Sequence, residues 1–254
     1  MKLFFRFSTI FTRSTATLLT ILCFETTSEE IHAAVASNFS DAMKEIVEKF
    51  ELRRNHEVIL SFGSTGRLYS QLMNGAPYDL FFSADSKRPE MLEINGVALP
   101  GSRFTYAIGK LVLWSLTRHF IDSSGDVLTE GNFKHLAIAN PDLAPFGLSA
   151  KEFLQHENLW EKMQKKILRG ENVAQAFHFV KSGAADLGFV SLSQIKRLDG
   201  KSKGSYWEVP QAFYTPIVQQ AVLLKESEAA RDFITFMTSD AAIAIILGFG
   251  YTVP

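Results

Sequence analysis

The chain has 254 residues, of which 46% are hydrophobic and 21% are charged, as expected for a soluble globular protein of one or two domains. The formal net charge is −1 and no long basic or acidic block is present, so the composition gives no indication of nucleic-acid binding. Phenylalanine is frequent, with 22 residues, and we interpret these rings mainly as core.

The first 28 residues differ from the rest and predict a secretory signal peptide. Three basic residues precede a short apolar run, Ala16–Phe24, and small residues follow it. This run is too short for a transmembrane helix, which needs about 20 apolar residues. Cleavage after Ser28 would leave a periplasmic protein without the single cysteine, Cys23, and therefore without disulfide or thiol chemistry. The alternative is a helical or disordered N-terminal extension.

The hydrophobic pattern of the first half predicts short strands that alternate with amphipathic helices. We expect strands at residues 31–36, 58–62 and 79–82, and helices at 40–50, 66–73 and after Asp85. This β-α-β-α-β-α order is typical of an α/β lobe with a mostly parallel sheet.

A second α/β unit is predicted further along the chain. We expect strands at 111–115, 136–139 and 187–190, and helices at 149–154, 158–164 and 172–182. A strand at 216–224 then returns to the first unit, and helices at 227–239 and 241–247 complete it. The chain is therefore predicted to form two lobes, lobe one from residues 29–108 and 218–254 and lobe two from residues 109–217.

Two polar turns follow predicted strands of lobe one. Ser37 and Asn38 precede one helix, and Ser64 and Thr65 lie between Gly63 and Gly66 before the next. Each turn by itself is most simply interpreted as a helix N-cap. Because both turns would lie at the same edge of the sheet, they also form a candidate anion site, in which helix N–H groups and hydroxyls donate.

Such a site would have to work without help from the overall charge. Removal of residues 1–28 leaves 23 Lys and Arg against 26 Asp and Glu, a net charge of −3. An anion would therefore be held by local dipoles and not by the net charge of the protein.

Few enzyme signatures are found in the sequence. It lacks H-E-x-x-H, P-loop and G-x-G-x-x-G motifs, and its six histidines are scattered without clear ligand spacing. An α/β enzyme with Ser37 or Ser64 as nucleophile stays an alternative, but it would need a general base and the sequence indicates none. We therefore expect a binding protein and not an enzyme.

Eight segments resemble, in order and with similar spacing, the periplasmic molybdate-binding proteins of ABC transporters. They are residues 34–39, 61–68, 75–85, 139–141, 144–147, 171–173, 186–190 and 249–251, and the resemblance covers essentially residues 30–254. It implies a type II periplasmic binding protein fold, an α/β fold with two lobes that each contain a mostly parallel sheet flanked by helices. The lobes would close on the ligand by bending near residues 107–110 and 215–218.

The resemblance also implies how lobe one holds the ligand. The ligand would be the molybdate or tungstate dianion, bound by neutral donors, so that molybdenum is held as molybdate and no cofactor is expected. Ser37 and Thr65 would supply hydroxyl and N–H donors, and Asn38 and Ser64 would assist.

Lobe two would contribute mainly main-chain groups. The resemblance implies backbone N–H donors from Phe146 and Val173, and it places Ser191 where some members have a tyrosine whose hydroxyl reaches the anion. A serine is shorter, so this donor would be lost or replaced by water. The implied partner is an inner-membrane ABC permease and the protein would be a monomer. The same fold bound to another oxyanion, sulfate or thiosulfate, is the closest alternative.

Overall fold

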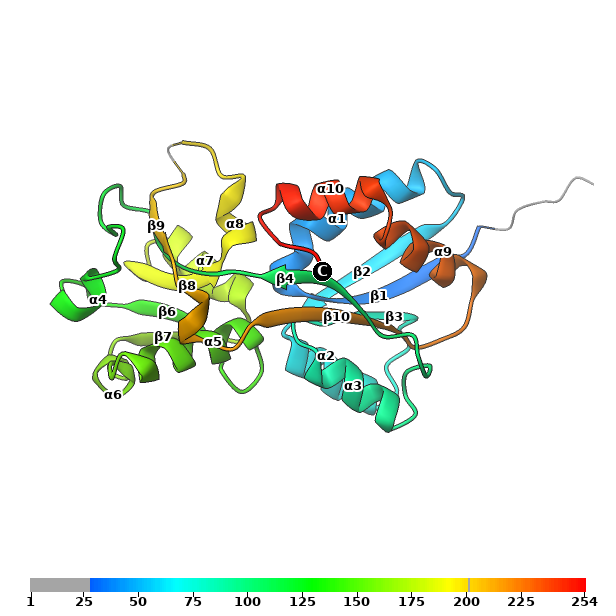
Figure 1. The fold of residues 1–254 in the computed structure, drawn as a ribbon, viewed down its shortest axis with the longest axis horizontal. Helices are drawn as coiled ribbons and strands as arrows, with labels where there is room; N and C mark the ends of the chain where they lie inside the picture. The colour runs from blue at the N-terminus through cyan, green and yellow to red at the C-terminus, as the bar shows by residue number, and fades with distance from the viewer. Residues whose placement is uncertain (1–27, 201) are drawn as a thin grey trace, which may run out of the picture.

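A computed structural model describes residues 28–200 and 202–254, so the predicted signal peptide lies outside the described residues except for Ser28. Two lobes lie side by side, each built on one five-stranded sheet, and long strands run between them (Figure 1). In the described part of the chain, no helix is long and apolar enough to cross a membrane.

Lobe one contains the sheet with the strand order β2-β1-β3-β10-β4. Its strands are β1 (Glu30–Ala36), β2 (Glu57–Gly63), β3 (Leu80–Phe82), β4 (Phe104–Gly109) and β10 (Ile217–Leu223). Strand β1 pairs in parallel with β2 and β3, whereas β10 runs antiparallel to β3 and β4. A single reversed strand therefore interrupts an otherwise parallel sheet.

Helices cover both faces of this sheet (Figure 1). They are α1 (Ser40–Glu51), α2 (Thr65–Met73), α3 (Lys87–Ile94), α9 (Glu228–Met237) and α10 (Asp240–Gly248). Strand β1 shows why both faces are covered, since Ala33 and Val35 pack into the core beneath α1, α9 and α10 while Ala34 packs toward α2 and α3. Burial on both faces is typical of parallel sheets.

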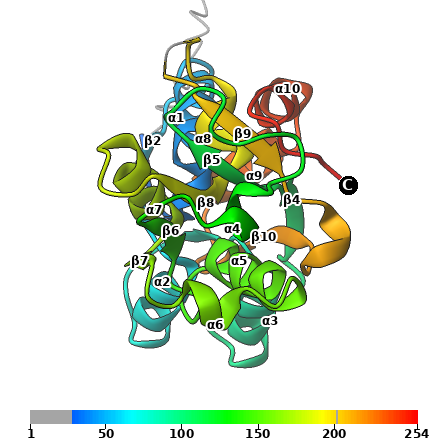
Figure 2. The same ribbon diagram turned by 90° about the vertical axis from the view of Figure 1, so that its left-hand side faces the viewer.

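Lobe two repeats the arrangement with the order β7-β6-β8-β5-β9 (Figure 2). Its strands are β5 (Leu111–Ser115), β6 (Leu136–Ala139), β7 (Ile167–Gly170), β8 (Leu187–Ser191) and β9 (Ser205–Glu208). Its helices are α4 (Val127–Glu130), α5 (Pro145–His156), α6 (Trp160–Met163), α7 (Val173–Lys181) and α8 (Leu192–Lys196). Only β5 is reversed, because it pairs antiparallel with β8 and β9. Two mostly parallel sheets flanked by helices confirm the predicted fold class.

The chain passes between the lobes twice. Lys110 alone separates β4 in the first sheet from β5 in the second. The return path runs from the end of β9 at Glu208, through the short 3-10 helix η2 (Gln211–Phe213), to the start of β10 at Ile217. Each sheet is therefore assembled partly from strands that are distant in sequence.

The start of α5 was predicted wrongly, and the error matters for the site. The helix was expected to begin at residue 149, whereas α5 begins at Pro145. Proline is favoured in the first turn because its fixed φ suits a helix and its missing N–H is not needed there. Phe146 is therefore the second residue of a helix and not part of a loop.

Candidate oxyanion-binding site

A small cavity lies between the lobes and brings together six of the seven predicted site residues. Ser37, Asn38, Ser64, Thr65, Phe146 and Val173 all line it. Its free volume is about 10 Å³, which is close to what one buried water molecule needs. The cavity therefore suits only a compact occupant.

The lobe-one side of the cavity is formed by three turns at the carboxyl ends of neighbouring strands. The 3-10 helix η1 (Ser37–Phe39) follows β1, Ser64 and Thr65 follow β2, and Ala84 follows β3. Ser37 was open to interpretation as a simple N-cap, but its side chain forms no hydrogen bond with any other described residue. Its hydroxyl is therefore available to a ligand.

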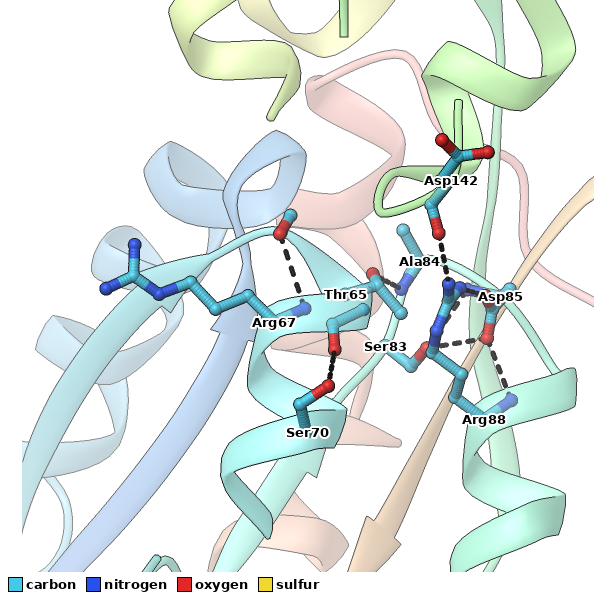
Figure 3. Close-up of polar contacts among 10 residues, drawn as sticks. Thr65, Arg67, Ser70, Ser83, Ala84, Asp85, Arg88 and Asp142 are labelled. Atoms are coloured by element: carbon cyan, nitrogen blue, oxygen red, sulfur yellow. Dashed lines mark hydrogen bonds and ion pairs between the residues drawn. The ribbon is translucent and has the colours of Figure 1, made fainter. Parts of the chain in front are cut away.

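The hydroxyls of Ser64 and Thr65 already accept hydrogen bonds from the main chain. Ser64 is the N-cap of α2, and its Oγ accepts from the Arg67 N–H at 3.4 Å. The Thr65 Oγ1 accepts from the Ala84 N–H at 3.1 Å (Figure 3). Each hydroxyl keeps its own proton, so both are set to donate to an anion.

Lobe two offers a main-chain donor at the start of α5. Pro145 has no N–H, and the Gly147 N–H is bound to the Ala144 carbonyl at 2.9 Å. Within the described chain this leaves the Phe146 N–H without a partner, although the Phe146 side chain is buried. The correction at α5 therefore gives a physical reason for the predicted Phe146 donor, because the first N–H groups of a helix have no partner inside it.

The start of α7 provides a similar donor. Asn172 is the N-cap of α7, and its Oδ1 accepts from the Gln175 N–H at 3.1 Å. The N–H of Val173, the first residue of α7, has no partner among the residues that the structure describes. Phe146 and Val173 thus point the positive ends of two helices toward one cavity.

Charged side chains do not take part in the described lining of this cavity, which consists of Ala, Ser, Asn, Gly, Thr, Pro, Phe and Val. Hydroxyls, free N–H groups and helix N-termini are its polar groups. An anion held by such neutral groups is stabilised by oriented dipoles and needs no ion pair.

Asn38 lines the cavity, but its carboxamide is engaged elsewhere. Its Nδ2 donates to Gln219 Oε1 at 2.7 Å and to the Tyr251 hydroxyl at 3.1 Å. The main-chain carbonyl oxygen of Asn38 accepts from the Tyr251 hydroxyl at 2.7 Å and from the Ser193 hydroxyl of lobe two at 3.0 Å. Burial raises the pKa of Tyr251 to about 12, so this phenol stays neutral. The Asn38 side chain thus secures the η1 turn.

Ser191 is the one predicted site residue that does not line the described cavity. It is fully buried, and its hydroxyl lies 2.8 Å from the Ser193 hydroxyl. Its N–H donates to Gln194 Oε1 at 3.0 Å, and Gln194 Nε2 in turn donates to the Val173 carbonyl at 3.3 Å. A serine at this position was expected to lose the donor or to act through water, and in the structure the capping box that starts α8 directs its hydroxyl to Ser193. Through Gln194, the same capping box supports Val173.

Contacts between the lobes were not predicted from the sequence. The Arg67 guanidinium donates to both carboxylate oxygens of Glu171 at 3.0 Å. The Gly66 N–H donates to the Leu143 carbonyl at 2.8 Å. The partners in each contact are far apart in sequence and have no local signature, although Gly66, Arg67 and Glu171 lie within segments that carry the resemblance.

Two similar lobes that close on a small polar cavity define a solute-binding protein, and comparison with known proteins agrees. The family profile described as bacterial extracellular solute-binding protein matches residues 31–252. The chain is 46% identical over 226 residues to the molybdate-binding protein ModA of Azotobacter vinelandii, covering 87% of this chain and 89% of that protein. It is 43% identical over 225 residues to ModA of Rhodobacter capsulatus, covering 87% of this chain and 88% of that protein.

A solved structure extends the similarity to the fold. The periplasmic molybdate-binding protein of A. vinelandii superposes with a TM-score of 0.85 at 45% identity, covering 88% of this chain and 99% of that one. The chain therefore belongs to the molybdate-binding protein family of bacterial extracellular solute-binding proteins. The sulfate-binding protein SubI of Mycobacterium tuberculosis shares the fold, with a TM-score of 0.70 at 15% identity.

Proposed function

We propose that this protein is the substrate-binding component of an ABC importer and that it binds molybdate or tungstate between its lobes. The single observation that carries the proposal is the convergence of unused donors on one small cavity. The hydroxyl protons of Ser37, Ser64 and Thr65 and the N–H groups of Phe146 and Val173 come from both lobes. An unprotonated tetrahedral dianion presents only acceptors and is the complementary ligand.

The donor set also predicts selectivity. Phosphate near neutral pH carries a proton, and in a cavity of donors that proton would lack an acceptor, which costs roughly 1–3 kcal/mol. Sulfate is unprotonated but is a smaller tetrahedron, and donors fixed on helix N-termini cannot all move inward to meet it. Molybdate and tungstate are nearly equal in size and should bind almost alike.

The donors themselves argue for binding and not for catalysis. Neither His, Asp nor Glu lines the described cavity, so Ser37 and Ser64 have no general base within it. Catalytic nucleophiles need such a base within hydrogen-bond reach. A compact dianion held by neutral donors requires no chemical step and no cofactor.

We further propose the molecular organisation that this role requires. Residues 1–28 direct export to the periplasm, residues 29–108 and 218–254 form lobe one, and residues 109–217 form lobe two. The monomeric mature protein delivers its ligand to a permease in the inner membrane. N-terminal sequencing of protein from a secreting host should find a start between about residues 26 and 31, and an intact Met1 would contradict export.

Calorimetric titration tests the ligand assignment. Purified protein is titrated with molybdate, tungstate, sulfate and phosphate at fixed ionic strength, followed by competition against bound molybdate. Molybdate and tungstate should bind with similar affinity and sulfate much more weakly. Displacement of molybdate by sulfate or phosphate at comparable concentration would refute the molybdate assignment and leave a general oxyanion-binding protein.

A further inference from the structure

Gly66 is the point where the main chains of the two lobes meet. It lies in the first turn of α2, and its N–H donates to the Leu143 carbonyl of lobe two at 2.8 Å. The neighbouring residue, Thr65, lines the anion cavity, but Gly66 itself does not. The contact therefore belongs to lobe closure and not to ligand coordination.

The absence of a side chain at Gly66 is what permits this contact. A Cβ atom at this position would lie 3.0 Å from both the Cα and the carbonyl oxygen of Leu143. Backbone atoms cannot move aside as a flexible side-chain tip can. Gly66 has no left-handed φ and lies inside a helix, so the local backbone does not require glycine. The space around Gly66 is limited instead by the main chain of lobe two and, at 3.1 Å from the same Cβ position, by the Nη2 atom of Arg88.

Arg88 forms a hydrogen bond with the Asp142 carbonyl of lobe two, next to Leu143 (Figure 3). Its Nη2 donates to the Asp142 carbonyl at 3.1 Å, while Nη1 is paired with the Asp85 carboxylate. Asp85 is itself held in place, because it accepts from the Ser83 hydroxyl and from the Arg88 N–H, both at 3.0 Å. The guanidinium is thus oriented by contacts that lie entirely within lobe one.

The Asp142–Leu143 segment precedes a proposed anion donor, the Phe146 N–H. The N–H groups of Leu143 and Ala144 both donate to the Asn140 carbonyl, at 3.2 and 2.9 Å, and so hold this segment in a turn. Pro145 and Phe146 follow as the first residues of α5. We therefore expect the position of Leu143 to influence that of the Phe146 N–H.

We propose that Gly66 and Arg88, together the docking seat, receive the Asp142–Leu143 carbonyls and set the closed position in which lobe-two donors reach the anion. Both are positioning residues, since neither lines the anion cavity. The inference rests on the proposed function. It adds that the affinity for the anion depends on Gly66, which leaves space for lobe two.

Gly66→Ala tests the seat directly. The lobes should fail to close fully, and the affinity for molybdate should fall about ten- to hundredfold, as for loss of a hydrogen bond to a charged group. Alanine favours helices more than glycine does, so the melting temperature without anion should stay constant or rise. A side chain at Gly200 would meet no atom within 4 Å, so Gly200→Ala is the matched control and should bind like wild type.

Arg88→Gln provides a second measurement, because it removes the bond to Asp142 without adding bulk near Leu143. We expect a smaller loss of affinity, about three- to tenfold, carried mainly by faster dissociation of molybdate.

Small-angle scattering should show less contraction on addition of molybdate for Gly66→Ala than for wild type. Wild-type affinity and contraction in Gly66→Ala, or an anion-free melting temperature that falls in step with affinity, would overturn the docking seat. Failure of wild type to bind any of the four oxyanions would instead overturn the proposed function.

Discussion

The two lobes share one topology but present different chemistry to the cavity. Lobe one contributes the hydroxyl side chains of Ser37, Ser64 and Thr65, whereas lobe two contributes the main-chain N–H groups of Phe146 and Val173. A hydroxyl donor depends on the identity of one side chain. A main-chain donor depends on where a helix begins, so almost any residue can occupy its position. In lobe one, loss of a hydroxyl side chain should therefore weaken anion binding. In lobe two, binding should weaken only when the main-chain N–H itself is removed.

Val173→Pro should give the largest effect, because it removes a main-chain donor. Proline is accepted as the first residue of a helix, and Asn172 before it is already extended at φ −140° and ψ 173°. The fold should persist while the affinity for molybdate falls at least tenfold and up to about a hundredfold. The control is Val173→Ala, which keeps the N–H and should bind nearly like wild type in calorimetry. Equal losses in the two variants would show that the side chain matters, contrary to the comparison.

Ser37→Ala and Thr65→Ala should each lower affinity about tenfold or more, since each removes a hydroxyl that would donate to a dianion. Thr65→Ala also leaves the buried Ala84 N–H without its acceptor, so it should reduce thermal stability as well. Thr65→Ser restores the hydroxyl and should recover most of the binding. Titrations in which both alanine variants match wild type would exclude these hydroxyls from the site.

Ser193→Ala should have an intermediate effect. The Ser193 hydroxyl of lobe two donates to the main-chain carbonyl of Asn38 in lobe one at 3.0 Å, and this bond can form only when the lobes are closed. Its contact with the Ser191 hydroxyl at 2.8 Å lies within lobe two and does not depend on closure. Loss of a neutral hydrogen bond of about 0.5–1.5 kcal/mol predicts a decrease in affinity of about two- to tenfold. The melting temperature should change more with molybdate present than without it. A decrease of the same size in both conditions would mean that Ser193 stabilises lobe two and not closure.

Phe146→Leu should have the smallest effect on binding. The ring is buried and packs in the core of lobe two, while only the N–H faces the anion. A smaller apolar side chain should cost stability, by roughly 1–2 kcal/mol, and leave affinity within about threefold of wild type. Chemical denaturation and titration measure the two quantities separately. A loss of binding greater than that of Ser37→Ala would contradict the assignment of Phe146 as a main-chain donor.

Most of the fold could be predicted from the sequence because the lobes bury both faces of their sheets. Apolar strands and amphipathic helices then alternate in a pattern that is visible locally, as at residues 111–115 and 136–139, which match β5 and β6. Strands β7 and β9 were not predicted. Each has four residues, lies at the edge of its sheet and is largely only half-buried, so neither produces a clear hydrophobic pattern.

The candidate site likewise has features that the sequence predicts and features that only the tertiary structure sets. The sequence by itself determined the polar turns after β1 and β2 and the helix that starts at residue 172, because strand ends and helix starts leave short-range signatures. Only the tertiary structure decided where individual groups point, turning Ser191 toward Ser193 and Asn38 toward Gln219 and Tyr251. It also decided that Gly66 must leave room for Leu143, 77 positions away in the chain. Such choices depend on how two lobes meet, and a contact between distant segments leaves no periodic trace in either of them.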